Sequence, residues 1–539
     1  MTKYPVTRLP PSVPERTIND LLLDRAERFA EQVGLIGESG YGGEVRLTYR
    51  ELLDRVRRLA TVLREQGVGR GDRVGILTTN AAIIESIVCY HAAHFLGAIA
   101  VPFNARYVAR ELSWVLAKTR PRVVLVSPDL LGLIAECYEE ADSVEPALLV
   151  TAVAPAAGDD VRRLISEAAP RDPVEVAEED DADWVFTSGT TGHPKAVAIT
   201  HAASVACGYQ SSRLWGLHER SVYSSSAPFF TSTGFHTNQL ATLAAGCAYL
   251  CEAEFDVYRT LANIERHRVT SVFIITGMLQ LIMERVGEDG LRDVDLSSLE
   301  RICYGAQPTS GTFAQSLERV FARARGIELV HLYGLTEGGT SGTLVRPDLH
   351  ADAIARALES SYGMPVGSEG FNEWIEVTVR DEDGNVVADG VVGELCLRGP
   401  ALMDRYVDEP EATARSLRDG LLYTGDFGVQ EDGYLFYVDR AGQMIRRGGL
   451  NISSVEIETV LSDCPGVREA AAVAVSNPIL GEEVAAVVVA IDESLDDIAV
   501  IDFCRTRLAD YKVPVRVEFV DQLPRNGMGR VQKHRLLSR

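Results

Sequence analysis

Helix and strand patterns alternate regularly through the N-terminal part of the chain. Thr48 and Glu51 have the spacing of a capping box, and apolar residues then recur at helical intervals up to about Gly67. Three strand-like runs and two further helical stretches follow, in the order 73–77, 81–96, 98–101, 108–118 and 123–126. Strands that alternate with helices of this length form parallel βαβ units, so the pattern predicts an α/β fold with helices on both faces of a sheet.

The chain has 539 residues, which is too long for a single hydrophobic core. From Phe371 to Tyr437 the pattern changes to short strands and tight turns, including Asp383-Gly384-Asn385, and past Arg440 it becomes that of a compact α+β unit. We therefore expect a large N-terminal domain at 1–439 with a β-rich subdomain at about 371–438, a hinge at 440–443, and a small C-terminal domain at 444–539.

The net charge of −24 argues against a nucleic-acid partner and against an anionic membrane surface. The first residues form a polar, proline-containing segment, and no run reaches about 18 apolar residues, so we expect a cytoplasmic protein without membrane insertion. The nine cysteines are scattered without a C-x-x-C pair, which favours reduced, buried thiols. From 505 to 539 there are nine Lys or Arg against three Asp or Glu, which suits a phosphate-bearing ligand or, equally, a solvated surface.

A loop rich in glycine and hydroxyl groups follows the apolar stretch 184–186. It reads Thr-Ser-Gly-Thr-Thr-Gly-His-Pro-Lys, and it is not a P-loop, because no Gly-Lys-Ser/Thr closes it. Glycine allows backbone N–H groups to turn inward, and the hydroxyls and the lysine add donors and positive charge. A flexible surface turn is the alternative. The pattern predicts a phosphate-binding loop made by Thr187, Ser188, Gly189, Thr190, Thr191, Gly192 and Lys195.

Three segments with unusual residues each follow a strand-like run. They begin at Thr187, at Gly305 and at Tyr333. Open parallel sheets place their ligand crevices at the carboxyl ends of strands, so we expect these loops to converge on one cleft.

Several motifs occur in an order that resembles the adenylate-forming superfamily, which includes acyl- and aryl-CoA ligases, peptide-synthetase adenylation domains and firefly luciferase. They are the phosphate-binding loop, 333–337 (Tyr-Gly-Leu-Thr-Glu), 423–426 (Tyr-Thr-Gly-Asp), 439–440 and 448–449. The resemblance extends from Leu47 to Leu536. It implies that ATP and Mg²⁺ are used to adenylate a fatty or aryl carboxylic acid, which then passes to coenzyme A after the small C-terminal domain moves.

The same resemblance implies a role for each matching residue. The loop 187–195 holds the β- and γ-phosphates, and Glu337 is the Mg²⁺ ligand, since Mg²⁺ bound to phosphate takes one or two carboxylates. Thr336 contacts the α-phosphate, and Asp426 accepts both ribose hydroxyls. The remaining nucleotide and coenzyme residues are Tyr333 and Gly334 near the adenine, Gly305, Ala306 and Gln307 as the adenine-side wall, Arg440 at the ribose or phosphate, and Gly449 at the pantetheine tunnel. The catalytic set is Lys195, Thr336, Glu337 and Arg530.

The segment 228–236 resembles the one that lines the carboxylate pocket in the superfamily, through Phe229, Phe230, Thr231, Gly234 and Phe235. Its aromatic residues suit an apolar or aryl acid, although an ordinary core role is equally compatible with the three phenylalanines. Amino-acid-activating relatives carry an Asp near here. None occurs between Tyr223 and Thr242, so a substrate with a free α-amine is disfavoured.

Two positions depart from the superfamily pattern. The segment 523–530 matches Leu-Pro-x-x-x-x-Gly-Lys, yet it ends in Arg530, and Gln443 stands where relatives have Asp or Lys. A guanidinium is a planar fork and an ammonium is a compact point charge, so the exchange is not conservative. Lys512 or Lys533 is an alternative source of the ammonium.

The two departures keep other functions open. These are activation of an unusual acid, such as nitrite for diazotisation of an aryl amine; transfer to an amine or a carrier protein; and nucleotide binding without turnover. A homodimer also remains open.

Overall fold

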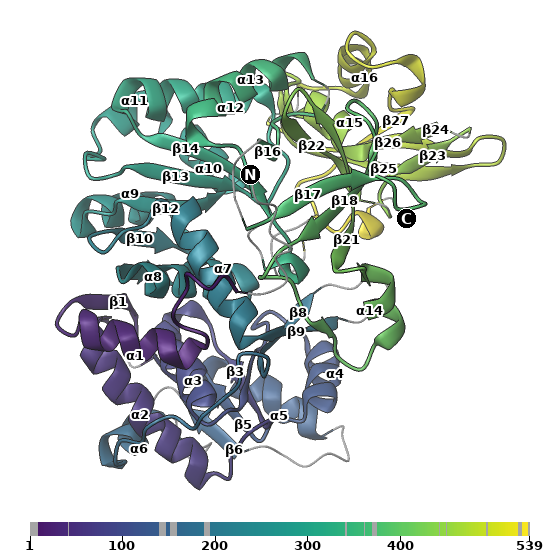
Figure 1. Cartoon of the computed structure of the whole chain (residues 1–539). Helices are drawn as coiled ribbons and strands as arrows, with labels where there is room; N and C mark the ends of the chain where they lie inside the picture. Colours follow the sequence, from purple (N-terminus) through teal and green to yellow (C-terminus); the bar gives the residue numbers. More distant parts are fainter. Residues whose placement is uncertain are drawn as a thin grey trace.

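A computed structural model of the protein describes residues 9–40, 42–139, 147–150, 159–187, 194–339, 342–360, 362–368, 374–440, 442–448, 450–491, 494–525 and 531–536. Four sheets organise the described residues. Two of them are eight-stranded and largely parallel, the third is antiparallel, and the fourth is formed by the C-terminal residues. The predicted α/β architecture, with a large N-terminal part and a small C-terminal unit, is confirmed (Figure 1).

The first eight-stranded sheet contains the predicted βαβ units. Its strands from β8 to β7 are parallel, and β9 and β19 extend it in antiparallel fashion. The order is β19 (Arg405–Tyr406), β9 (Lys195–Thr200), β8 (Asp181–Thr187), β4 (Ile99–Pro102), β3 (Arg73–Leu77), β5 (Val123–Val126), β6 (Ala147–Val150) and β7 (Asp159–Asp160).

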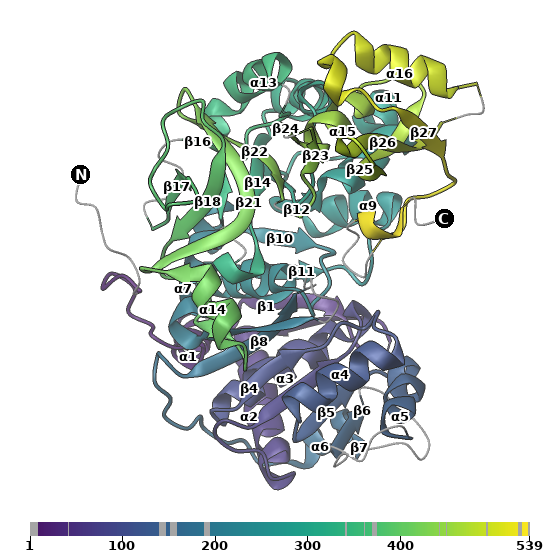
Figure 2. The same cartoon turned by 90° about the vertical axis from the view of Figure 1, so that its right-hand side faces the viewer.

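Helices cover both faces of this sheet (Figure 2). On one face α4 (Ala109–Thr119) and α5 (Leu131–Glu139) pack over β3, β4 and β5. On the other lie α2 (Tyr49–Glu65), α3 (Ile83–Phe95) and α6 (Val161–Glu167). The predicted capping box is present, because Thr48 Oγ1 accepts from the backbone N–H of Glu51, whose side chain accepts from that of Thr48.

The second eight-stranded sheet is parallel from β1 to β14, with β2 and β15 antiparallel at its edges. Its order is β15 (Thr343–Leu344), β14 (Glu328–Tyr333), β13 (Arg301–Gly305), β12 (Ser271–Ile275), β10 (Val222–Ser225), β11 (Ala248–Cys251), β1 (Val33–Glu38) and β2 (Glu44–Thr48). The accompanying helices are α1 (Ile18–Arg28), α7 (His201–Leu214), α8 (Leu240–Ala245), α9 (Val257–His267), α10 (Thr276–Arg285), α11 (Gly287–Arg292), α12 (Gly311–Leu317) and α13 (His350–Glu359).

A smaller antiparallel sheet follows, as the strand and turn pattern predicts. Its strands are β16 (Gly367–Ser368), β22 (Tyr434–Arg440), β21 (Leu421–Glu431), β18 (Gly393–Arg398) and β17 (Glu376–Arg380), with β20 (Leu417–Arg418) beside β21 and α14 (Pro410–Ser416) before it. The predicted turn is present, with Gly384 at φ 84° and the N–H of Asp381 bonded to the carbonyl of Asn385. Glycine tolerates this φ because it has no Cβ.

The C-terminal unit has its own sheet and its own apolar core. The sheet contains β24 (Leu450–Ile452), β23 (Ile445–Arg447), β26 (Gly481–Ala490), β25 (Val467–Asn477) and β27 (Arg516–Phe519), and the helices are α15 (Ser454–Ser462) and α16 (Asp497–Arg505). Asp439 at the end of β22 joins this unit to the rest, because its carboxylate accepts from both the N–H and the hydroxyl of Ser454, at 2.6 and 2.7 Å. The residue boundaries of the domains remain a prediction.

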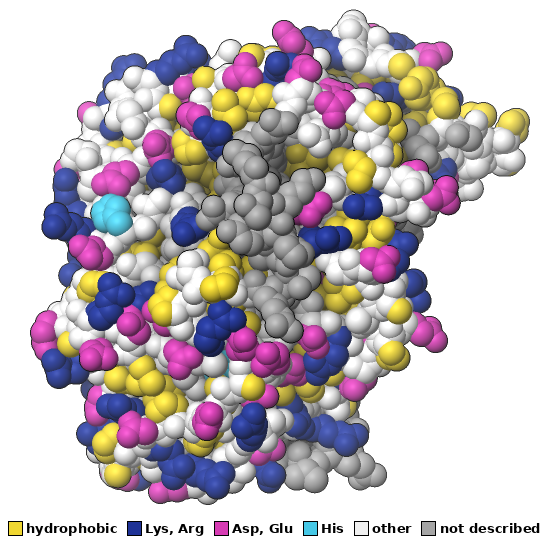
Figure 3. All heavy atoms as spheres, viewed as in Figure 1, with side chains coloured by type: hydrophobic (Ala, Val, Ile, Leu, Met, Phe, Trp, Pro, Cys, Tyr) yellow, Lys and Arg dark blue, Asp and Glu magenta, His cyan; other side chains and the backbone are white. Residues whose placement is uncertain are grey.

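All nine cysteines are free and buried, as predicted. Within the described parts of the chain, no helix combines the length and the apolar character that crossing a bilayer requires. The face shown in Figure 3 mixes acidic and basic side chains without a large area of one sign.

Candidate functional site

The two ends of the predicted phosphate-binding loop lie side by side. Thr187 ends β8 and Lys195 begins β9, and the two residues are directly paired in the antiparallel ladder. The ladder therefore fixes both ends of the loop. The residues between them that were predicted to bind phosphate, Ser188 to Gly192, lie outside the described residues.

Glu337 lies beside this pair. It belongs to a short 3₁₀ turn, Thr336–Gly338, just after β14. Its Oε1 accepts from the hydroxyl of Tyr406 at 3.0 Å and lies 3.5 Å from Oγ1 of Thr187, while Lys195 Nζ lies 4.9 Å from the centre of the Tyr406 ring. Thr187 and Glu337 come from different sheets, so the expected convergence of these two strand ends is confirmed.

Tyr406 was not predicted from the sequence. It is on the short edge strand β19, which pairs with β9 and so carries the phenol toward both Lys195 and Glu337. Burial, together with the nearby Glu337 carboxylate, raises the pKa of Tyr406, so the phenol stays protonated and donates its hydrogen bond. An aromatic residue on a two-residue strand carries little local signal, and only the pairing of β9 with β19 reveals its place.

A second group forms around Asp426. This carboxylate is largely buried, and its Oδ2 accepts a 2.6 Å hydrogen bond from the hydroxyl of Tyr333. Arg440 is the cross-strand partner of Asp426, and its Nε lies 3.5 Å from Asp426 Oδ1. Burial, with Asp426 beside it, raises the pKa of Tyr333 well above its usual value, so Tyr333 is a hydrogen-bond donor. The predicted ribose-side residues Asp426 and Arg440 thus lie together with the predicted adenine-side Tyr333.

The two groups face one another through Arg440. Burial lowers the pKa of Arg440, but the charges of Asp426 and then Glu337 outweigh it, and the pKa is raised. One guanidinium therefore lies within electrostatic reach of both carboxylates. The donor set suits Mg²⁺, which prefers a carboxylate with further oxygens supplied by phosphates, and Glu337 lies among hydroxyl oxygens.

The predicted adenine-side wall has a constrained backbone. Gly305 ends β13 at φ 152°, and a Cβ there would overlap the carbonyl oxygen of Leu332 on β14. Ala306 follows at φ 62°, which is uncommon for a residue other than glycine. The side chain of Gln307 turns away to accept from the N–H of Gly277 at the start of α10, at 3.1 Å. The wall is therefore formed mainly by backbone, and strained backbone is often found at binding sites.

The predicted acid-binding segment is tightly packed. Thr231 uses its hydroxyl within the turn, donating to the carbonyl of Pro228 at 2.7 Å and accepting from Gly234 N–H at 3.0 Å. A Cβ at Gly234 would overlap the carbonyl oxygen of Pro228. Phe229 and Phe235 are in the main core, 5.8 Å apart between ring centres, and these contacts favour the core role for both. Phe230 is also buried, at 9% exposure.

A buried carboxylate connects this segment to β8. Asp183 has no exposed surface, and its Oδ2 lies 2.9 Å from His236 Nε2 and accepts from Ser204 at 2.9 Å and from Tyr90 at 3.1 Å. Its Oδ1 lies 3.1 Å from His94 Nε2. Burial alone would raise the pKa of Asp183, but the hydrogen bonds from His236 and His94 lower it, so the group is a carboxylate. None of the predicted site residues belongs to this network.

The C-terminal lysines considered as substitutes for Arg530 are already paired. Lys512 Nζ lies 2.7 Å from Glu456, and Lys533 Nζ lies 2.7 Å from Glu458 and 2.6 Å from the hydroxyl of Ser454. Gln443 lies in a turn, and its N–H donates to the carbonyl of Arg440. Arg530 and Gly449 lie outside the described residues.

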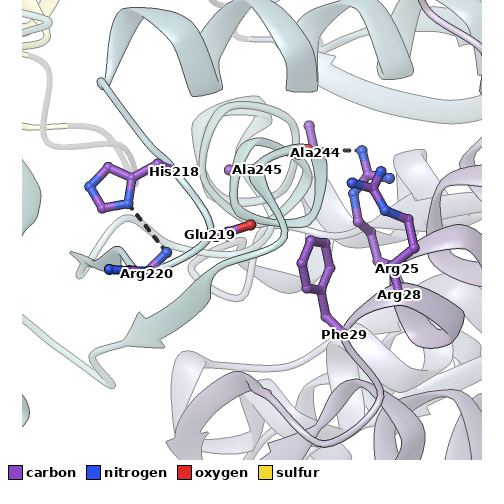
Figure 4. Close-up of a pocket in the computed structure, with 8 residues that line it drawn as sticks. All are labelled: Arg25, Arg28, Phe29, His218, Glu219, Arg220, Ala244 and Ala245. Atoms are coloured by element: carbon purple, nitrogen blue, oxygen red, sulfur yellow. Dashed lines mark hydrogen bonds between the residues drawn. The ribbon is translucent and has the colours of Figure 1, made fainter.

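A separate cavity of about 500 Å³ lies between α1, the turn after α7 and the end of α8 (Figure 4). None of the predicted site residues lines it; its lining includes Arg28, Phe29 and Arg220. The buried Arg25 also lines this cavity. Its guanidinium pairs with Glu15 at 2.8 Å and also donates to the hydroxyl of Tyr209 and to the carbonyl of Ala244.

Comparison with known families agrees with this geometry. Residues 22–407 match the family model described as AMP-binding enzyme, and residues 456–530 match the AMP-binding enzyme C-terminal domain. Together the two matches include most of the chain; Asp426 and Arg440 lie between them.

The chain is similar to curated enzymes over nearly its whole length. It is 33% identical to the 3-[(3aS,4S,7aS)-7a-methyl-1,5-dioxo-octahydro-1H-inden-4-yl]propanoyl:CoA ligase of Mycobacterium tuberculosis, over 96% of this chain and 99% of the relative. It is 31% identical to the long-chain-fatty-acid–CoA ligase FadD13 of the same species, over 91% and 92%. Among solved structures, the amide bond synthetase McbA of Marinactinospora thermotolerans is similar, with a TM-score of 0.80 and 29% identity over 95% of this chain and 98% of that one.

Proposed function

This chain belongs to the AMP-binding enzyme family, and we propose that it is an AMP-forming ligase that joins a carboxylic acid to coenzyme A. The observation that carries the proposal is that Thr187, at one end of the phosphate-binding loop, lies 3.5 Å from Glu337, while Tyr333, four residues before Glu337, donates to Asp426 at 2.6 Å. A nucleoside triphosphate carries both a ribose and phosphates, so one molecule could contact both groups of residues. Curated relatives that are acid–CoA ligases over more than nine-tenths of both chains support the reaction type.

The reaction has two steps. First, a carboxylate oxygen of the acid attacks the α-phosphorus of ATP, the bond to the β-phosphate oxygen breaks, and pyrophosphate leaves. Second, the sulfur of coenzyme A attacks the acyl carbon, the bond to the AMP oxygen breaks with its electron pair, and the thiol proton passes to solvent. Both steps place negative charge on oxygen, so fixed donors aimed at that charge are the main source of acceleration.

Each residue has a role that follows from its surroundings. Thr187 and Lys195 close the phosphate-binding loop and supply a hydroxyl and a positive charge at its ends. Glu337 would hold Mg²⁺, which supplies charge neutralisation at the phosphates when bound. Asp426 would accept from the ribose hydroxyls, Tyr333 would orient Asp426, and Thr336 would contact the α-phosphate. Gly305 and Ala306 would let the adenine ring approach the backbone.

Transfer to an amine is the second candidate. The similarity to an amide bond synthetase, at 29% identity over nearly the whole chain, favours it, as does Arg530 in the position of the superfamily lysine. Activation of nitrite for diazotisation belongs to the same group of alternatives. These candidates keep the nucleotide site and change the acid or the acceptor.

The decisive experiment measures pyrophosphate release from ATP. Fatty acids, aryl acids and nitrite are each supplied with Mg²⁺, with and without coenzyme A or an aryl amine, and the products are identified by mass spectrometry. Formation of an acyl-CoA supports the leading proposal, and an amide or a diazonium product supports the second. If the protein binds ATP but no acid causes it to release pyrophosphate, the remaining alternative is a nucleotide-binding relative without turnover. Glu337→Ala is the site control and should lower Mg²⁺-dependent release at least tenfold, which is about 1.4 kcal/mol.

The variant Arg530→Lys separates two meanings of the unusual arginine. If the leading proposal holds, restoring the compact ammonium should raise the rate of pyrophosphate release, because a point charge suits converging oxygens better than a planar fork. A fall of tenfold or more, about 1.4 kcal/mol, would instead indicate that Arg530 is adapted to a different acid or acceptor.

A further inference from the structure

We propose that Asn80 is a positioning residue for the acid, because it holds residues 226–229 in place as one wall of the acid site. The inference rests on the proposed function and adds to it a residue that determines how tightly the acid is bound. Asn80 begins a 3₁₀ turn, Asn80–Ala82, which follows β3 of the first eight-stranded sheet. Residues 226–229 follow β10 of the second sheet and are named the acid-side wall.

The carboxamide of Asn80 makes three hydrogen bonds, all with backbone groups at strand ends of the second sheet. Its Nδ2 donates to the carbonyl of Ala227 at 3.0 Å and to that of Glu252, just after β11, at 3.1 Å. Its Oδ1 accepts from the N–H of Phe229 at 2.9 Å. Only this orientation of the amide gives every partner its complement, since two carbonyls face the nitrogen and one N–H faces the oxygen. Asn80 thus connects the end of β3 to the ends of β10 and β11.

The turn that carries Asn80 is itself firmly placed. Asn80 is 5% exposed, and within the turn the hydroxyl of Ser86 donates to the carbonyl of Ala82 at 2.7 Å. A Cβ at Gly37 on β1 would overlap Cγ2 of Ile83, so the start of α3 packs directly against the second sheet. A side chain can position another segment through hydrogen bonds only when its own backbone is fixed, and this condition is met here.

The acid-side wall has a buried back and an accessible front. Ala227 and Phe229, which bond to Asn80, are 6% and 2% exposed. Their neighbours Ser226 and Pro228 are partly exposed. Asn80 therefore holds the wall from behind, while the front keeps surface that solvent reaches.

The front of the wall borders the predicted adenine-side wall. Ser226 Oγ lies 4.0 Å from Met278 Sδ on α10, and the N–H of the preceding Gly277 donates to Gln307 at 3.1 Å. All four of these residues are partly exposed. They follow β10, β12 and β13, which are neighbouring parallel strands, so they share one edge of the sheet. An acid against this wall would lie beside the nucleotide with which it reacts.

A shift of the wall would also spread into the predicted acid-binding segment. A Cβ at Gly234 would overlap the carbonyl oxygen of Pro228 and would lie 2.7 Å from Phe229 Cα. Thr231 donates to the same carbonyl of Pro228 at 2.7 Å. Residues 231–234 are thus packed on the backbone that Asn80 holds. Because small displacements in a pre-arranged site are costly, loss of the Asn80 bonds should weaken binding of the acid.

Asn19 provides a matched control. It is a buried asparagine, 3% exposed, and its Nδ2 donates to the backbone carbonyl of His94 at 2.9 Å. This bond joins α1 to α3 and involves none of the predicted site residues. Removing the Asn19 amide therefore disturbs a buried hydrogen bond of the same kind without touching the acid-side wall.

The test compares the full-length wild type with Asn80→Ala, Asn80→Ser and Asn19→Ala. The acid is the one that the wild type uses best among the fatty and aryl acids of the pyrophosphate assay. KM is determined for this acid at saturating ATP and Mg²⁺, and for ATP at saturating acid. Backbone hydrogen exchange without ligands, followed by mass spectrometry, reports on peptides that cover 226–236 and 18–28. Asn80→Ser leaves a smaller gap and one hydroxyl, and it replaces Asn80→Ala if that variant does not fold.

We expect Asn80→Ala to raise the KM for the acid fivefold or more, with the KM for ATP within twofold of the wild type. Asn80→Ser should act in the same direction with a smaller effect. Hydrogen exchange at 226–236 should be faster in both variants, because the N–H of Phe229 loses its acceptor. Asn19→Ala should keep both KM values and the exchange at 226–236 within twofold of the wild type, with any faster exchange confined to 18–28.

Three results would overturn the inference. An acid KM that Asn80→Ala leaves unchanged, although 226–236 exchanges faster, would remove the wall from the acid site. Acid and ATP KM values that rise together, or an acid KM that rises equally in Asn19→Ala, would indicate a general loosening of the fold. Unchanged exchange at 226–236 would show that Asn80 does not hold the wall. Failure of the proposed function is distinct from these, because the wild type would then release no pyrophosphate with any acid.

Discussion

At the scale of single residues, the candidate metal ligand depends on side chains from distant parts of the chain. Glu337 contacts Thr187 and Tyr406, and its backbone carbonyl accepts from the N–H of Met403 at 2.8 Å. Tyr406 also lies over Lys195, so one phenol positions a carboxylate and an ammonium together. Such positioning determines how well the charges meet the phosphates, because small displacements are costly when the donors are pre-arranged.

We expect Tyr406→Phe to raise the Mg²⁺ concentration needed for half-maximal pyrophosphate release three- to tenfold. The substitution removes the 3.0 Å hydrogen bond to Glu337 and keeps the ring beside Lys195. A hydrogen bond to a charged group contributes about 1.5–3 kcal/mol, and part of this is recovered when solvent replaces the phenol. The measurement is a Mg²⁺ titration at saturating ATP.

Tyr434→Phe is the matched control. Tyr434 also donates to a carboxylate, Asp352, at 2.7 Å, but it does so away from Glu337. This variant should show the Mg²⁺ dependence of the wild type. Equal shifts in the two variants would mean that Tyr406 does not act through Glu337.

At the scale of elements, Asp183 holds β8 against the segment that follows β10. β8 leads directly to Thr187, and His236 belongs to the π-helical segment Thr233–Gln239. The carboxylate accepts from Tyr90, Ser204 and two histidines, all buried. The phosphate-binding and acid-binding parts of the proposed site are therefore tied to one buried charge.

Asp183→Asn should lower the free energy of unfolding by about 3 kcal/mol, as expected when one member of a buried charged network is lost. The KM for ATP should rise as well, because β8 positions Thr187. Urea unfolding and initial rates measure the two effects. Asp181→Asn is the control: on the same strand it pairs with the half-exposed Arg405 at 2.7 Å, and a pair of this kind contributes about 1 kcal/mol or less. Similar losses in both variants would contradict the role of Asp183.

Local patterns predicted the elements that depend on neighbours in sequence. The capping box at Thr48, strand β3 and strand β5 all lie where periodicity and capping chemistry indicated, because these depend on nearby residues. The site was predicted at strand ends such as Thr187 and Tyr333, since carboxyl ends of parallel strands share one edge.

Features that depend on pairing across the chain escaped prediction. Tyr406 is 69 residues from Glu337 in sequence. It reaches the site only because its strand, β19, pairs with β9. The Asp183 network joins four elements. His236 belongs to the singled-out segment 228–236, but no local pattern indicates that it pairs with Asp183 on β8. Hydrogen bonds between such distant positions are set by the fold as a whole and leave no local periodicity.

At the scale of the whole molecule, buried neutral histidines link the stability of the fold to pH. Burial lowers the pKa of His91 and of His201 to about 3, and that of His331 to about 4. In the unfolded chain each would titrate near its ordinary value of 6.5. His91 is on α3, His201 begins α7 and His331 is on β14, so the effect involves both eight-stranded sheets.

The sign follows from proton counting. Below about pH 6.5 the unfolded chain binds protons at these histidines and the folded protein does not, so the free energy of unfolding falls as pH decreases toward 4. Each histidine contributes up to about 1.4 kcal/mol per pH unit in this window.

We expect urea midpoints measured between pH 7.5 and 5 to be constant above about pH 7 and to fall steadily below it. His91→Gln removes one titrating group and should make the slope shallower. A midpoint that stays constant down to pH 5, or a slope that His91→Gln leaves unchanged, would show that these histidines are protonated in the folded protein.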